Sequence, residues 1–167
     1  MNLINKKNNY LNLITNIENL LNQEQYELSL LANAASLIKE YVLNTNWVGF
    51  YLLKDNLLIL GPFQGRVACN PIIVGSGVCS HSVLQKETIV VKDVHKFVGH
   101  IACDEQTNSE IVVPIFINNR IYGVLDIDSK SFNRFSKLDK YYLEQIVGII
   151  SSHIKRIQLQ SEVKSLI

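Results

Sequence analysis

The chain has 167 residues, of which 47% are hydrophobic and 19% are charged, and its formal net charge is +1. This length suits a domain with a substantial core, and the near-neutral charge without a basic stripe argues against nucleic-acid binding. The first residues lack the apolar run of a secretory signal, and no apolar run is long enough to span a membrane. We therefore expect a cytoplasmic protein that binds neither nucleic acid nor membrane.

The first 45 residues carry two helical patterns. Apolar residues recur at helical spacing over residues 3–21 and again over residues 24–43, with a break near Asn22 and Gln23. These patterns predict two N-terminal helices, each with one packing face.

The middle of the chain alternates short β-prone runs with loops. An aromatic run at residues 47–53 and an apolar run at 57–60 flank a turn and predict two paired strands. Glycine and proline punctuate residues 61–69, which predicts a loop there. A short apolar run follows at residues 71–74. Further elements are expected as strands over residues 88–91, 110–117 and 120–128, a short helix near 78–85, and a long helix over about 138–160.

This order of elements predicts an α+β domain with a mainly antiparallel sheet. The N- and C-terminal helices should pack on one face, and the connections at 61–87 and 92–109 should cover the other. A space between a sheet face and such loops is a natural small-ligand pocket. We expect a single domain over residues 1–167, divided into N-terminal helices (1–45), sheet and pocket loops (46–135) and a C-terminal helix (136–167).

Three acids lie on two neighbouring strands. Strand side chains alternate between faces, so Asp126 and Asp128 share one face. Glu110 begins the preceding strand, and a two-residue turn at Asn118–Asn119 would place the two aspartates opposite positions near 111 and 109. All three acids could then lie together. Clustered carboxylates repel, so a cluster indicates a cationic ligand or a shared proton, whereas separate acids would simply be solvated.

The three cysteines are Cys69, Cys79 and Cys103, and an odd number without an export signal argues against a disulfide framework. Cys103 lies in the polar loop at 92–109, with His100 nearby. A histidinium there could lower the pKa of the thiol and favour its reaction with an electrophile, while neighbouring carboxylates would oppose this. An inert thiol is an equally good interpretation of Cys103, and a better one for the other two cysteines.

Other patterns are weaker. The cysteine and histidine spacings match no usual zinc framework, so we expect no structural metal, and no cofactor is indicated. Gly75-Ser76-Gly77 lacks the P-loop lysine and predicts a turn before the short helix. Trp47 and Tyr51 share a strand face, where they could wall a small ligand or a cation, or pack in the core.

Taken together, these segments resemble the free methionine-R-sulfoxide reductases, which are small GAF-domain enzymes. The resemblance runs from about Asn46 to the final helix and includes all three cysteine positions. It rests chiefly on the motifs NWVGFY (46–51), LGPFQG (60–65), GHIACD (99–104), NSEIVVP (108–114) and GVLDIDS (123–129). It implies a GAF fold, usually in a homodimer, and the reduction of free L-methionine (R)-sulfoxide to methionine.

The resemblance also implies roles for the cysteines. Cys103 would attack the sulfoxide sulfur and become a sulfenic acid as methionine leaves. Cys69 would condense with it to a disulfide, which thioredoxin would reduce, and Cys79 would be an alternative resolving thiol. A disulfide requires Cα atoms within about 7 Å, so Cys69 must approach Cys103 in the fold.

The acids and aromatic residues match the same family. Glu110, Asp126 and Asp128 would be its substrate-binding and catalytic carboxylates, and Trp47 and Tyr51 would be its pocket aromatics. Acids that hold an ammonium group would select the free amino acid over a peptide-bound residue. The alternative is a non-catalytic GAF sensor of a small molecule or of redox state, which would not require three thiols at these positions.

Overall fold

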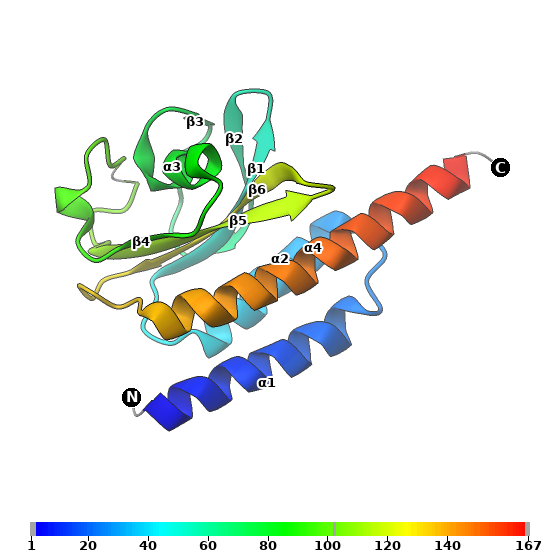
Figure 1. The fold of residues 1–167 in the computed structure, drawn as a ribbon, viewed down its shortest axis with the longest axis horizontal. Helices are drawn as coiled ribbons and strands as arrows, with labels where there is room; N and C mark the ends of the chain where they lie inside the picture. Colours follow the sequence, from blue (N-terminus) through cyan, green and yellow to red (C-terminus); the bar gives the residue numbers. More distant parts are fainter. Residues whose placement is uncertain (1–2, 102, 166–167) are drawn as a thin grey trace.

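The computed structural model describes residues 3–101 and 103–165. These residues form helices and a six-stranded sheet (Figure 1). In chain order the elements are α1 (Leu3–Leu21), α2 (Glu27–Tyr41), β1 (Trp47–Lys54), β2 (Leu57–Gln64), β3 (Ile72–Ile73), α3 (Gly77–Gln85), β4 (Ile89–Val91), the 3-10 helix η1 (Val94–Lys96), β5 (Ser109–Ile117), β6 (Arg120–Ser129) and α4 (Lys137–Ser165).

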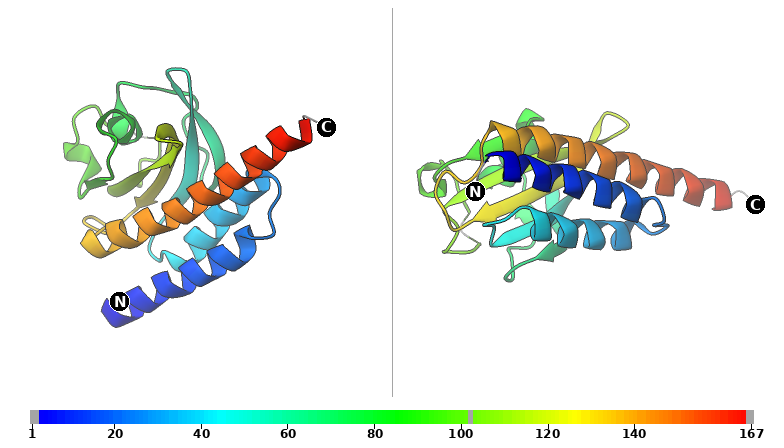
Figure 2. Two further views of the ribbon diagram at one scale, coloured as in Figure 1. Left: turned by 45° about the vertical axis from the view of Figure 1, so that its right-hand side comes forward. Right: turned by 90° about the horizontal axis from the view of Figure 1, so that it is seen from below.

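The sheet has the strand order β3-β2-β1-β6-β5-β4, and every neighbouring pair is antiparallel. Helices α2 and α4 pack on one face of this sheet, and α1 lies across both of them as an outer layer (Figures 1 and 2). Helix α3 and the connecting loops lie over the opposite face (Figure 1). This arrangement confirms the predicted α+β architecture.

Strand β2 is longer than the sequence pattern predicts, because residues 61–64 continue it instead of forming a loop. The short strand β3 pairs only with Leu57 and Leu58, so β2 is an edge strand at Pro62. The register between β1 and β2 also shifts at this point, between Gly49 and Tyr51. Proline is tolerated at sheet edges and at bulges, which explains how the strand passes through this segment.

Strand alternation divides the interior into two apolar clusters. Leu125 and Ile127 on β6 belong to the larger cluster, beneath α1, α2 and α4. Val124, on the other face of the same strand, belongs to a smaller cluster with Trp47 and Tyr51. Asp126 shares the face of Val124, as its position predicts, and is therefore directed toward the loop-covered side.

A buried acid near the start of α4 ties this helix to α1. Asp139 accepts hydrogen bonds from Tyr10 (2.7 Å), Arg134 (3.0 Å) and the backbone N–H of Ser136 (2.7 Å), and it pairs with Lys6. The bond from Ser136 forms half of a capping box. Burial alone would raise the pKa of Asp139, but the hydrogen bonds from Lys6 and Ser136 outweigh it and hold the pKa at about 2.

Across the part of the chain that the structure describes, no helix has the length and hydropathy needed to cross a bilayer.

Candidate active site

A pocket lies between the sheet, helix α3 and the loop that precedes β5. Every residue singled out from the sequence as a site candidate lines this pocket except Cys69, which is bonded to a lining residue. The loop is attached to its surroundings at both ends: the N–H of Gly77 donates to the carbonyl of Gly99 (2.9 Å), and the N–H of Asn108 donates to the carbonyl of Ser129 (2.8 Å). The scaffold therefore fixes the loop over the polar end of the sheet.

Cys69 and Cys103 form a disulfide across the pocket rim. Their Cα atoms are 5.5 Å apart although 34 residues separate them in the chain. The carbonyl of Cys69 accepts a hydrogen bond from the Tyr51 hydroxyl (2.9 Å), which anchors this segment to β1. Arg66 and Asp104, close to the two cysteines in sequence, form an ion pair at 3.7 Å between an exposed guanidinium group and a mostly buried carboxylate. The approach of Cys69 to Cys103 that the resemblance implies is present in the structure.

His100 does not supply the positive charge considered for Cys103. Burial lowers the pKa of His100, and the nearby His95 lowers it further, so the neutral imidazole is favoured near pH 7. The Nδ1 atom of His100 lies 4.0 Å from a carboxylate oxygen of Glu110. A neutral ring at this distance interacts with the acid as a dipole, and the two residues do not form a full ion pair.

The acids come together through a shift in strand register. Glu110 lies directly opposite Asp128, whereas an unshifted register from the hairpin turn would place it opposite Ile127. A bulge between positions 115 and 116 of β5 and their partners causes this one-residue difference from the predicted pairing. Because strand residues alternate faces, the shift brings Glu110 to the face that carries Asp126 and Asp128.

The acid cluster is held in an environment that disfavours charge. Glu110 is 5% exposed and Asp126 is 7% exposed. Burial raises the pKa of Asp126 to about 7, and burial together with the neighbouring aspartates raises the pKa of Glu110 well above its ordinary value. Asp128, half-buried, has a pKa raised by burial and by Asp126 and Asp104. These raised pKa values favour a proton shared within the cluster near neutral pH.

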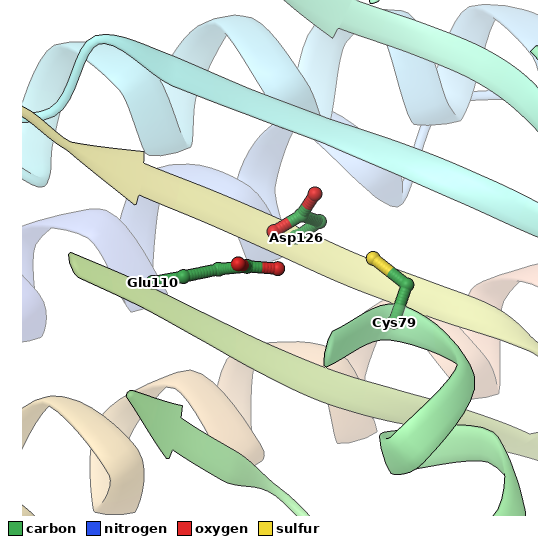
Figure 3. Close-up of side chains that lie close together, drawn as sticks. All are labelled: Cys79, Glu110 and Asp126. Atoms are coloured by element: carbon green, nitrogen blue, oxygen red, sulfur yellow. The ribbon is translucent and has the colours of Figure 1, made fainter. Parts of the chain in front are cut away.

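Cys79 adds a thiol to this cluster from helix α3, and its side chain points toward the two deeper acids (Figure 3). Its sulfur and one carboxylate oxygen each of Glu110 and Asp126 all lie within 4.8 Å of one another. Burial raises the pKa of the Cys79 thiol well above its ordinary value, and the acids raise it further. This environment therefore favours the protonated form of the Cys79 thiol.

An aromatic wall closes the pocket on the β1 side. The Trp47 ring stacks on Tyr51 and on Phe63, with centroid distances of 5.9 Å and 5.4 Å. The ring lies directly over Gly49, where an added Cβ would come within 2.4 Å of it. Phe63 was not predicted to belong to the site, because its segment was expected to be a loop, although apolar residues continue through that segment.

Comparison with proteins of known identity shows which family this chain belongs to. A family model described as GAF domain matches residues 28–155. The free methionine-R-sulfoxide reductase of Escherichia coli (strain K12) is 47% identical over 145 residues, which cover 87% of this chain and 88% of that protein. This chain belongs to the free methionine-R-sulfoxide reductase family. Both the resemblance seen in the motifs and the expected GAF fold are confirmed.

Solved structures of the reductase family superimpose closely on this chain. The fRMsr of Staphylococcus aureus in its reduced form has a TM-score of 0.84 at 49% identity, covering 86% of this chain and 94% of that chain. The free methionine-R-sulfoxide reductase from Neisseria meningitidis, solved in complex with its substrate, has a TM-score of 0.87 at 38% identity and covers 91% of each chain. The backbone of this reductase-family member therefore follows those of its relatives over most of its length.

Proposed function

We propose that this chain reduces free L-methionine (R)-sulfoxide to L-methionine, with Cys103 as the nucleophile. The observation that carries this proposal is the disulfide between Cys69 and Cys103 at a pocket lined by three acids. A disulfide at the pocket is the expected product state of a reductase that takes both electrons from its own thiols. The relationship to free methionine-R-sulfoxide reductases supports the same activity.

The proposed chemistry has two steps. In the first, the Cys103 sulfur attacks the sulfoxide sulfur, the S–O bond breaks, and the oxygen is transferred to the cysteine as a sulfenic acid while methionine leaves. In the second, the Cys69 sulfur attacks this sulfenic acid, the disulfide forms and water leaves. The sulfoxide sulfur gains the two electrons that the pair of thiols loses.

The acids and the aromatic wall have separate roles in this proposal. Free methionine sulfoxide carries an ammonium group, which the ionised carboxylates among Glu110, Asp126 and Asp128 would hold while another carboxyl of the cluster keeps the shared proton. A protonated carboxyl would donate a hydrogen bond to the sulfoxide oxygen and assist its departure. Trp47 and Tyr51 would pack against the methyl and methylene groups.

The same geometry favours one cysteine as the resolving thiol. Cys69 is already bonded to Cys103, whereas Cys79 stays a buried free thiol, so we assign Cys69 as the resolving cysteine and Cys79 as a reserve. We further propose that thioredoxin reduces the disulfide, that the enzyme works in the cytoplasm where thioredoxin keeps thiols reduced, and that it acts as a homodimer.

Turnover of the two sulfoxide epimers tests the proposal. Wild type should reduce L-methionine (R)-sulfoxide but not the S epimer, with dithiothreitol as reductant. Cys103→Ser should abolish this activity. Cys69→Ser should retain it with dithiothreitol and lose most of it with thioredoxin, because only the reserve thiol of Cys79 could then resolve the sulfenic acid. Cys79→Ser is the matched control and should retain activity with both reductants.

Two results would contradict the assignment. Activity in Cys103→Ser would transfer the nucleophile's role to Cys69 or Cys79. An inactive, fully reduced wild type would favour the sensor alternative, in which the disulfide reports the redox state instead of completing a catalytic cycle.

A further inference from the structure

Three metal-binding side chains converge in the deepest part of the pocket. Cys79 comes from helix α3, Glu110 from strand β5 and Asp126 from strand β6 (Figure 3). One ligand atom from each lies within 4.8 Å of the other two, and all three residues are buried. These positions are far apart in the sequence, so no spacing motif could reveal them.

The cluster lacks a compensating cation among the residues that the structure describes. The basic group paired with Glu110 there is the imidazole of His100, at 4.0 Å, and Asp126 has no such partner. One oxygen of Asp126, Oδ1, also lacks any hydrogen-bond partner although the residue is 7% exposed. Leaving a buried acceptor unsatisfied costs free energy, so this oxygen marks a position that a ligand would complete.

We propose that Cys79, Glu110 and Asp126 bind a divalent transition-metal ion, and that Zn²⁺ fits best. A thiolate ligand favours Zn²⁺ over Mg²⁺ or Ca²⁺, and carboxylate oxygens complete a mixed ligand set. Tetrahedral Zn²⁺ holds such atoms about 3.5 Å apart, given bond lengths of about 2.3 Å to sulfur and about 2.1 Å to oxygen. Since the atoms lie within 4.8 Å of one another, side-chain rotations that shorten the longest separation by at most about 1.3 Å would reach this geometry.

Binding is an exchange of protons for the metal, with no change of oxidation state. The thiol of Cys79 loses its proton to water, and the carboxyl groups lose the proton that they share. The three protein ligands leave a fourth position open toward the pocket, where water would bind.

This site is complete while Cys69 and Cys103 are oxidised. The disulfide leaves Cys79 as the one free thiol of the three cysteines, so the metal does not depend on the redox-active pair. If the proposed function is correct, Zn²⁺ and the substrate's ammonium group would compete for the same carboxylates. Zinc would then be a reversible inhibitor of this reductase.

The test uses the full-length, disulfide-bonded protein. Zn²⁺ affinity is measured by competition with a chromophoric chelator, and Co²⁺ is used as a spectroscopic probe of a metal–thiolate bond. Wild type should bind one ion per chain and show a thiolate-to-cobalt charge-transfer band. Cys79→Ser should lose the band and weaken Zn²⁺ binding at least tenfold, and Glu110→Gln should weaken binding to a similar extent.

His81→Gln is the matched control, since His81 is exposed on the same helix as Cys79 and should leave the affinity unchanged. Circular dichroism shows whether each variant is folded. If Cys79→Ser does not fold, the loss of affinity in Glu110→Gln tests the proposal. Equal affinity in wild type and Cys79→Ser, a cobalt complex without a thiolate band, or no binding at all would overturn the proposal. These readouts do not depend on turnover, so the site and the enzymatic function can fail independently.

Discussion

Removing the ammonium group from the substrate should weaken catalysis, because the acid cluster would lose its charged partner. The two informative substrates are N-acetyl-methionine sulfoxide and the deamino analogue 4-(methylsulfinyl)butanoate, each with the R configuration at sulfur. The deamino analogue is smaller than the natural substrate, so any loss of activity with it cannot be a steric clash. The comparison therefore isolates the interaction with Glu110, Asp126 and Asp128.

The size of the effect follows from the burial of the acids. Glu110 is 5% exposed and Asp126 is 7% exposed, so water screens their interaction with a bound cation only weakly. A hydrogen bond to a charged group contributes about 1.5–3 kcal/mol. Since about 1.4 kcal/mol corresponds to a tenfold change, kcat/KM should fall by about 10- to 150-fold with either analogue.

Steady-state kinetics with carboxylate-to-amide variants identify which acid is responsible. Replacing the carboxylate that holds the ammonium group should lower kcat/KM for the natural substrate. The same replacement should leave kcat/KM for the deamino analogue almost unchanged. Replacing a carboxyl that protonates the sulfoxide oxygen should instead lower kcat for both substrates. The exposed Glu105→Gln is the control and should leave the preference intact. Equal kcat/KM for the natural substrate and the deamino analogue in wild type would refute the role given to the acids.

Three further predictions concern packing, pH and stability. Gly49→Ala should displace the Trp47 ring, destabilise the protein by about 1–3 kcal/mol and raise KM. In the control Gly148→Ala the new Cβ meets open space in α4, so stability and KM should not change. Thermal denaturation and steady-state kinetics check both variants. The single-turnover rate of methionine formation by pre-reduced protein should decline as the pH rises through about 7, because Asp126, whose pKa is raised, loses its proton there. A rate that keeps rising with pH would exclude a protonated carboxyl as the acid. Asp139→Asn should lower the free energy of unfolding by about 2–3 kcal/mol at pH 7, because the lowered pKa of Asp139 stabilises the fold above about pH 4. This contribution disappears as the pH falls toward 2. The urea midpoints of wild type and variant should therefore converge in acid.

Local patterns in the sequence were sufficient for most of the fold. Helical spacing over residues 3–21 predicted α1 because periodicity depends only on residues close together in the chain. Strand alternation likewise predicted that Asp126 and Asp128 share a face, which the register with β1 bears out. The continuation of β2 through Pro62 was not predicted. Proline breaks a strand only where a neighbouring strand needs its missing N–H for a hydrogen bond, and the pairing of strands in the folded sheet decides whether one does.

The sequence by itself determined the kinds of groups in the site and the face that each strand residue takes. Only the tertiary structure decided which of these groups meet. One bulge moves Glu110 from the helix-covered face to the pocket, because a shift of one residue reverses every side chain of a strand relative to its partner. Long-range packing alone brings Cys69 within disulfide reach of Cys103 and places Cys79 beside the acids, since nothing within each local segment specifies what lies across the pocket.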